Sequence, residues 1–157
     1  MSVRYFEDIA IGTRQVLGSY TFTEDAIVDF ARKYDPQIFH IDREAAARSF
    51  YGGIIASGWH TIAVFMKLAV ASRDSLPADQ RRAAAGVSPG FENLLWHKPV
   101  RPGMTLTYST CVLETVELKS RPEWGLVKTR IEARDTDGTL MMSFTGKGFV
   151  QRRPTSP

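Results

Sequence analysis

The chain has little cysteine, with Cys111 standing alone among 157 residues. One cysteine cannot form a disulfide within its own chain, so a secreted scaffold held together by disulfides is excluded. A reducing compartment, the cytoplasm, is expected instead. Cys111 lies in the alternating segment TLTYSTCVLETV, which is typical of a β-strand, and we interpret it as a structural residue.

The chain also lacks a strong excess of charge and a long hydrophobic run. Its 20 basic and 17 acidic residues give a net charge of only +3, so no nucleic-acid partner is expected. The most apolar stretch, residues 54–66, contains Ser57 and His60 and is too short to span a bilayer. The beginning, MSVRYFEDIA, has no apolar segment of signal-peptide length. No membrane association is therefore expected.

Motifs for metal, nucleotide and serine-nucleophile chemistry are missing as well. The 3 histidines form no H-x-H, H-E-x-x-H or Cys/His cluster, so we expect no metal and no cofactor. Neither the G-x-S-x-G turn of serine hydrolases nor a G-x-x-x-x-G-K phosphate loop occurs. His60 is interpreted as a first-turn helix residue facing a pocket wall or solvent, and His97 as a structural residue in a turn.

What the sequence does contain is helical periodicity in its first half and strand alternation in its second. Ile27, Phe30, Ala31 and Tyr34 recur at helical spacing, and Thr23 is placed to cap that helix. The predicted helices are 24–34, 43–48 with Asp42 as its cap, and 58 to about 72; the predicted strands are 13–23, 90–96, 105–118, 125–134 and 140–151.

This order of elements predicts an α+β architecture. The long helix from Gly58 is apolar on most sides, so we expect it to be buried, with one face made of Ile62, Phe65, Met66 and Ala69. The strands that follow should pair antiparallel, with Asp137–Gly138 as a hairpin turn. No repeat or linker divides the chain, so residues 1–157 are predicted to form a single hot-dog domain, an antiparallel sheet wrapped around one long helix.

The segment YDPQIFH, residues 34–40, places an acid and an imidazole five residues apart. Pro36 disfavours helical geometry at Asp35, so the preceding helix should end there and His40 should follow on an irregular segment. Two titratable groups on a rigid bend can act on one point, as general acid–base chemistry requires. A structural interpretation stays open, because Asp before Pro commonly caps a turn.

The sequence after this bend extends the pattern to a family. YDPQIFHID, an alanine-rich stretch and FYGGIIASGWHTIAVF together resemble the (R)-specific enoyl-CoA hydratase motif of the MaoC-like dehydratase family. YFEDIAIGTR and HKPVRPGMTL resemble two strand entries of the same family, so the resemblance covers nearly the whole chain. The matching positions of the motif are Asp35, Gln37, His40, Asp42 and Gly58.

The chain departs from the family's pattern in three places. Gln37-Ile38 stands where Asn-Pro is common, and Met104 stands where an aspartate is usual. Met66 occupies a position at which some members carry a small polar residue near the acyl group. The acyl chain, whether straight, branched or dicarboxylic, therefore stays open.

The resemblance implies a hydro-lyase that reversibly hydrates a trans-2-enoyl-CoA to an (R)-3-hydroxyacyl-CoA. Asp35 and His40 would be its acid–base pair. The backbone N–H of Gly58 would bind the thioester oxygen, since the first amides of a helix are free and glycine permits close approach. The candidate substrate-binding residues are Gln37, Ser57, Trp59 and Met66.

Coenzyme A would then enter only as part of an acyl-CoA substrate, and resembling proteins imply a homodimer or a larger homo-oligomer with a shared ligand tunnel. Lys98, Arg101 and Arg152 could contact its phosphates or could be ordinary solvated charges. Two alternatives remain, a hot-dog thioesterase and a non-catalytic acyl-binding or assembly module. The absence of Asp and Glu from residues 60–72 argues against the first, and the intact Asp35–His40 pair argues against the second.

Overall fold

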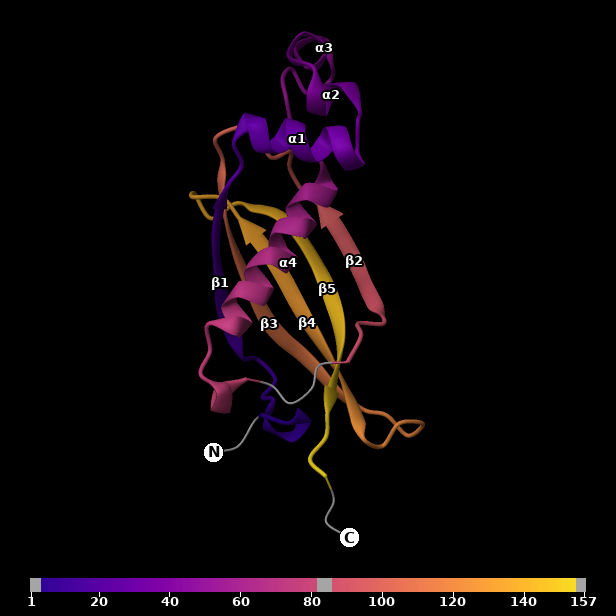
Figure 1. Cartoon of the computed structure of the whole chain (residues 1–157). Helices are drawn as coiled ribbons and strands as arrows, with labels where there is room; N and C mark the ends of the chain where they lie inside the picture. Colours follow the sequence, from indigo (N-terminus) through magenta and orange to yellow (C-terminus); the bar gives the residue numbers. More distant parts are fainter. Residues whose placement is uncertain (1–3, 82–85, 155–157) are drawn as a thin grey trace.

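The computed structural model describes residues 4–81 and 86–154, and its main feature is one antiparallel sheet (Figure 1). The strands lie in the order β1-β3-β4-β5-β2, so β1 and β2 form the two edges. Their bounds are β1 (Arg14–Thr21), β2 (Gly90–Trp96), β3 (Thr105–Glu117), β4 (Trp124–Arg134) and β5 (Leu140–Gln151).

The long helix α4 (Gly58–Asp74) crosses one face of this sheet, and the sheet curves around it (Figure 1). Three shorter helices gather at one end of the sheet, whereas both termini lie at the opposite end (Figure 1). They are α1 (Glu24–Tyr34), α2 (Ile38–Ile41) and α3 (Arg43–Arg48); two short 3₁₀ helices, η1 (Phe6–Asp8) and η2 (Ala78–Gln80), complete the elements. The α+β class and the hot-dog fold are thereby confirmed.

The predicted helix caps explain where the short helices begin and end. Thr23 accepts a hydrogen bond from the Ala26 N–H at 3.2 Å, and Asp42 accepts one from the Ala45 N–H at 2.8 Å. Asp35 ends α1 in a non-helical conformation (φ −153°, ψ 69°), as expected before proline. The prediction that His40 lies on an irregular segment was wrong. Proline constrains only its own neighbourhood, and the chain re-enters a helical turn, α2, after Gln37.

The core lies between α4 and the inner face of the sheet. Its buried members include Phe22, Ile27, Val64, Leu106 and Met142. Ile62 and Phe65 pack against this core as expected, but Met66 is 56% exposed, so the predicted buried face was partly wrong. Because α4 is apolar on nearly every side, spacing alone could not decide which side meets the sheet.

The strand predictions agree with the structure to within one or two residues at most ends. Asp135 organises the turn between β4 and β5, where its side chain accepts hydrogen bonds from the N–H groups of Asp137 and Thr139. Gly138 has φ +82°, a conformation that favours glycine. Among the described residues, none of the helices is both long and apolar enough to cross a membrane.

Candidate active site

Asp35 and His40 meet at the end of the sheet covered by α1–α3. The Nε2 atom of His40 lies 3.2 Å from Oδ2 of Asp35. The His40 side chain is only 5% exposed, whereas the Asp35 side chain is 16% exposed. The bend at Pro36 therefore brings the predicted acid and imidazole into direct contact, with the carboxylate as the more accessible partner.

The imidazole of His40 is held in one orientation by backbone. Its Nδ1 lies 2.7 Å from the carbonyl oxygen of Ile55, and a carbonyl oxygen can only accept, so Nδ1 carries a proton. The Ile55 N–H in turn donates to the carbonyl oxygen of Phe39 at 3.2 Å, so Ile55 itself is fixed against α2. Nε2 is thereby directed to Asp35.

The carboxylate of Asp35 is held by two further donors. Ser57 Oγ donates to Oδ2 at 2.7 Å, and Gln37 Nε2 donates to Oδ1 at 2.8 Å. Burial raises the pKa of Asp35, but these hydrogen bonds and the charge of His40 outweigh it, so the pKa lies below its ordinary value of 3.8. Asp35 is therefore ionised across the neutral range. The amide of Gln37 thus holds the carboxylate of Asp35 in place.

Ser57 and Gly58 begin α4 directly beside this carboxylate. Ser57 is the N-cap, and its Oγ accepts a hydrogen bond from the Trp59 N–H at 3.2 Å while donating to Asp35. The Gly58 N–H has no hydrogen-bond acceptor in the described part of the chain. One hydroxyl thus joins the end of α1 to the start of α4, and a free backbone donor lies next to that junction.

The sequence analysis missed Trp96, which explains why residue 58 is glycine. A Cβ atom at Gly58 would lie 2.3 Å from Cε2 of the Trp96 indole, far inside van der Waals contact. Only glycine lets the ring of Trp96 approach the start of α4 this closely. No spacing rule connects position 58 to position 96, because the contact depends on where the edge strand β2 lies relative to α4.

The other two predicted substrate-binding residues lie on the outer side of α4. Trp59 is 52% exposed and meets Trp96 edge to face, with ring centroids 5.6 Å apart. Met66 follows two turns later and is 56% exposed. Neither makes a ring contact or hydrogen bond with Asp35 or His40 among the described residues. The structure therefore brings Gln37 and Ser57 to the Asp35–His40 pair, but not Trp59 or Met66.

His60 differs from its interpretation as a wall or solvent-facing residue, because it is buried (6% exposed). Its ring stacks on that of Phe30, with ring centroids 4.6 Å apart and an interplanar angle of 4°. It meets the rings of Tyr20 and Phe22 edge to face. Burial lowers its pKa from 6.5 to about 4, and Nδ1 has no partner among the described residues. The reason for the difference is tertiary: α1 packs over the first turn of α4.

His97 follows strand β2 and makes a tertiary hydrogen bond, as its structural interpretation anticipated. Its Nε2 lies 2.9 Å from Oγ of Ser143 on β5. This bond ties the end of β2 to the neighbouring strand, and His97 makes no ion pair with a carboxylate of the described chain.

The basic candidates for coenzyme A binding occupy different places. Arg152 pairs with Glu7 at 3.0 Å and with Glu117 at 3.2 Å. It directly follows β5, which ends on the side of the sheet away from α1–α3 (Figure 1). Arg101 donates to the Tyr51 carbonyl at 2.7 Å, in the loop that leads to Ile54 and Ser57. Arg152 therefore forms ion pairs that connect the two ends of the chain, whereas Arg101 lies beside the loop that precedes Ser57.

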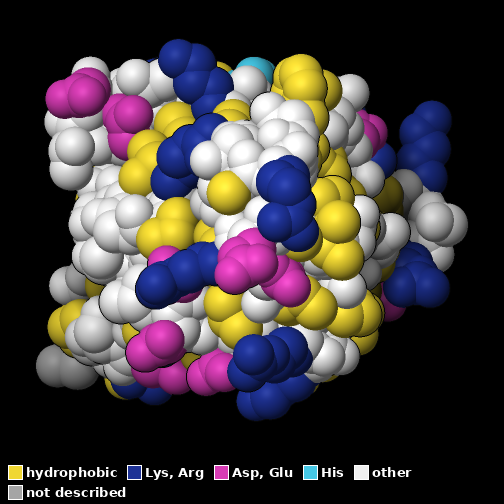
Figure 2. Space-filling model, turned by 90° about the horizontal axis from the view of Figure 1, so that it is seen from above, with side chains coloured by type: hydrophobic (Ala, Val, Ile, Leu, Met, Phe, Trp, Pro, Cys, Tyr) yellow, Lys and Arg dark blue, Asp and Glu magenta, His cyan; other side chains and the backbone are white. Residues whose placement is uncertain are grey.

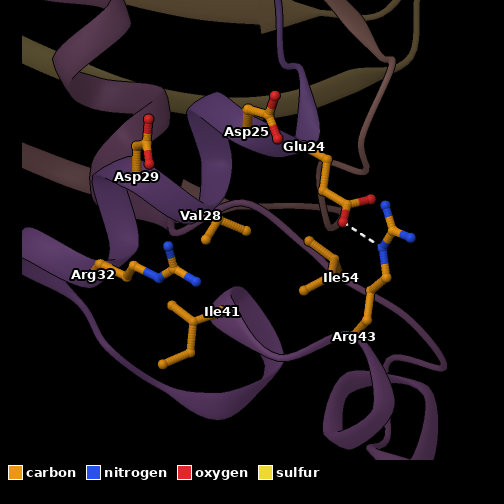
Figure 3. A pocket seen from close by; sticks show the side chains of 8 residues that line it. All are labelled: Glu24, Asp25, Val28, Asp29, Arg32, Ile41, Arg43 and Ile54. Atoms are coloured by element: carbon orange, nitrogen blue, oxygen red, sulfur yellow. Dashed lines mark hydrogen bonds and ion pairs between the residues drawn. The ribbon is translucent and has the colours of Figure 1, made fainter.

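A cavity of about 420 Å³ lies beside α1, and neither Asp35 nor His40 lines it (Figure 3). Its wall carries Glu24, hydrogen-bonded to Arg43 at 2.6 Å, and its other lining residues are Asp25, Val28, Asp29, Arg32, Ile41 and Ile54. Figure 2, which looks onto this end of the molecule, shows acidic and basic side chains mixed among hydrophobic ones. Charge of one sign does not dominate this face.

The fold and the site define the class as a single-layer hot-dog protein with an Asp–His pair at the start of the central helix. The model of the MaoC like domain matches residues 8–133, and the chain belongs to this family. Protein MaoC of Klebsiella aerogenes is 33% identical over 121 residues, which cover 73% of this chain and 32% of that protein. The chain spans less than half the length of the curated relatives that it matches.

Two solved structures extend the comparison. A MaoC-like dehydratase from Rhodospirillum rubrum is 39% identical and superposes with a TM-score of 0.83, over 96% of this chain and 99% of that one. An (R)-hydratase from A. caviae is 21% identical, with a TM-score of 0.65 over 94% and 99% of the two chains. The family thus supports a hydratase or dehydratase, and the more distant likeness shows the shared fold.

Proposed function

We propose that this protein is a hydro-lyase that reversibly hydrates a trans-2-enoyl-CoA to an (R)-3-hydroxyacyl-CoA. The observation that carries the proposal is the contact of His40 Nε2 with Asp35 at 3.2 Å, in an orientation set by the Ile55 carbonyl. Membership of the MaoC-like family and the name of its (R)-hydratase neighbour support the reaction class and its stereochemistry. Hydration needs three features: an acid–base pair, a position where a water molecule is held, and a donor to the oxyanion.

In the forward reaction the pair binds one water between the carboxylate of Asp35 and Nε2 of His40. The water gives a proton to this pair as its oxygen forms a bond to C3 of the enoyl group. The electron pair of the C2–C3 double bond moves toward the thioester oxygen, and C2 then takes a proton from the same pair. Atoms and charge balance without a metal or a redox partner, so the proposal includes no cofactor, and coenzyme A is only part of the substrate.

The negative charge that develops on the thioester oxygen needs a fixed donor. The Gly58 N–H suits this role because it has no acceptor among the described residues and lies one residue from Ser57, which touches Asp35. A donor already in place stabilises the enolate-like transition state without reorganisation. Gly58 therefore binds the oxygen at one end of the reacting group, while Asp35 and His40 act at C2 and C3.

A panel of acyl-CoA substrates tests the reaction. Straight, branched and dicarboxylic enoyl-CoAs are incubated with the protein, and absorbance of the conjugated thioester is followed, with release of free thiol measured in parallel. Hydration removes the conjugated absorbance without releasing thiol. Thiol release would instead support the thioesterase alternative, and binding without either change would support an acyl-binding module.

Variants of the pair then test the assignment of the residues. Asp35→Asn and His40→Ala should each lower turnover by about 10²–10⁴-fold, because either change removes one of the two groups that hold and deprotonate water. Asp29→Asn is a matched control, since Asp29 lies on the same helix α1 and lines the separate cavity of Figure 3. Near-normal turnover in a folded Asp35→Asn variant would refute the assigned roles.

We also propose that the active form is at least a homodimer. The edge strand β2 and the outer side of α4 carry exposed aromatic residues, namely Trp59 (52%), Phe91 (49%) and Trp96 (44%). An open strand edge beside exposed apolar side chains favours pairing with a second copy. Multi-angle light scattering of the active protein tests this, and an active species with the 17.6 kDa mass of one chain would refute it.

A further inference from the structure

Trp96 is the side chain that most closely approaches the start of α4. If Gly58 carried a Cβ, that atom would be 2.6 Å from Nε1 of the indole and 2.3 Å from Cε2. Trp96 is the last residue of β2, and its ring also meets the ring of Trp59 edge to face. The indole N–H thus lies in the immediate neighbourhood of the Gly58 backbone.

The direction of the contact matters as much as its closeness. In an α-helix each Cα–Cβ bond tilts toward the N-terminus of the helix, and the first N–H groups point the same way. Nε1, 2.6 Å from the Cβ position of Gly58, therefore lies beside the first turn of α4, whose free N–H groups point toward the helix N-terminus. In the described part of the chain, Nε1 of Trp96 has no hydrogen-bond acceptor.

Standard geometry shows that one oxygen can reach both donors. A Cβ atom lies about 2.5 Å from its own backbone nitrogen, so the 2.6 Å contact puts Nε1 no more than about 5.1 Å from the Gly58 nitrogen. Two donors that each lie about 2.9 Å from one oxygen can be up to about 5.8 Å apart. The separation of these two nitrogens is therefore within the range of a two-donor oxyanion site.

We infer that Trp96 is a second catalytic donor, whose indole N–H binds the thioester oxygen together with the Gly58 N–H. This inference rests on the proposed hydration of an enoyl thioester. It also gives the exposed ring of Trp96 a chemical role: an indole donates but cannot accept, so it favours an oxygen that gains negative charge. Gly58 and Trp96 would then form one oxyanion site with two donors.

Trp96→Phe tests the donor, because it keeps an aromatic ring over Gly58 and removes the N–H. Loss of one oxyanion donor typically lowers kcat on the order of 10²-fold, with a smaller effect on KM. Trp124→Phe is the matched control, since it makes the same chemical change at the first residue of β4, at the other end of the sheet (Figure 1). A second variant with benzothienylalanine at position 96 keeps the shape of indole while replacing N–H by sulfur.

A spectroscopic measurement separates this inference from the reaction itself. A 2,4-dienoyl-CoA bound to Asp35→Asn protein should absorb at longer wavelength, because donors at the thioester oxygen polarise the conjugated system. Adding Trp96→Phe should reduce this shift, while Trp124→Phe should leave it unchanged. Absence of turnover in the wild type refutes the proposed function. The second donor is refuted by any one of three results: an absorbance shift that is equal with and without the Trp96 N–H, no absorbance shift, or an unchanged kcat in Trp96→Phe.

Discussion

Replacing His60 with phenylalanine should make the free energy of unfolding fall less as the pH is lowered. His60 is 6% exposed, stacks on Phe30 and is surrounded by aromatic edges, so its neutral ring is compatible with the fold and its cation is not. Burial lowers its pKa from 6.5 to about 4. The folded protein therefore binds the proton more weakly than the unfolded chain, and protonation favours unfolding.

The size of the effect follows from these two values. Well above pH 6.5 the ring is neutral in both states and contributes no pH dependence. Each tenfold difference in proton affinity is about 1.36 kcal/mol, so His60 lowers the free energy of unfolding by about 2 kcal/mol between pH 7 and pH 5, and by about 3 kcal/mol at pH 4. The loss occurs as the pH falls from 6.5 toward 4.

Urea unfolding at pH 7 and pH 5 measures this contribution as a difference between variants. Subtracting the change in His60→Phe from that in the wild type should leave about 2 kcal/mol, whatever other groups titrate. His97→Phe is the control for replacing a histidine by phenylalanine, because His97 is exposed and lies outside the aromatic cluster around His60. Equal pH dependence in wild type and His60→Phe would refute the reasoning.

Three further outcomes are expected at the site. Ser57→Ala should raise the pKa of Asp35 by removing a 2.7 Å hydrogen bond, so the acid limb of the pH–rate profile should move to higher pH, and loss of the α4 cap should cost about 1 kcal/mol in urea unfolding. In a Trp96→Ala background, Gly58→Pro should lower kcat on the order of 10²–10³-fold while Gly58→Ala, which keeps the N–H, should not; equal activities would place the oxyanion donor elsewhere. Gln37→Ala should raise the pKa of Asp35 in the same direction as Ser57→Ala, and an unchanged acid limb in both variants would show that these hydrogen bonds do not tune the carboxylate.

The paired design at Gly58 follows from two structural facts. Ser57 has φ −57° and ψ 138°, which is the conformation that a residue before proline prefers, and the first turn of a helix tolerates proline. In the wild-type protein, however, a proline ring would collide with Trp96, whose Cε2 would be 2.3 Å from the new Cβ. Shortening Trp96 removes that collision, so in this one background the Gly58→Pro and Gly58→Ala variants differ chiefly in the backbone N–H.

Much of the local structure could be predicted because local chemistry determines it. Thr23 and Asp42 cap helices through their own side chains, and Pro36 ends α1 at Asp35 by a steric effect on its neighbour. Alternation in the second half of the chain gave the strands because each strand presents one face to the core. The proximity of Asp35 to His40 was likewise accessible, since only five residues and one rigid bend separate them.

What the sequence could not supply were contacts made through the backbone or through the placement of the sheet. The Ile55 carbonyl orients His40, yet every residue has a carbonyl and no residue type marks this one. The burial of His60 and the exposure of Met66 depend on which side of an evenly apolar helix meets the sheet and α1. Such a helix has several nearly equivalent faces, and the packing of the whole domain selects one.

The contact between Trp96 and Gly58 illustrates why motif reasoning cannot find a pair of residues that only the tertiary fold brings together. The glycine of ASGWHT is readily explained by its local sequence, as a turn or as a close approach to a ligand. Nothing in that local sequence indicates a contact with residue 96. The register of β2 against β5 carries a bulge between Glu92 and Leu95, with Asn93 at φ 56°. That extra residue shifts the alternation of the strand, so that Leu94 packs against the core and Trp96 reaches Gly58 on the same inner side. Deleting one residue of the bulge should therefore turn the indole away from α4, and the position of Trp96 over the start of that helix depends on a single irregularity in an edge strand.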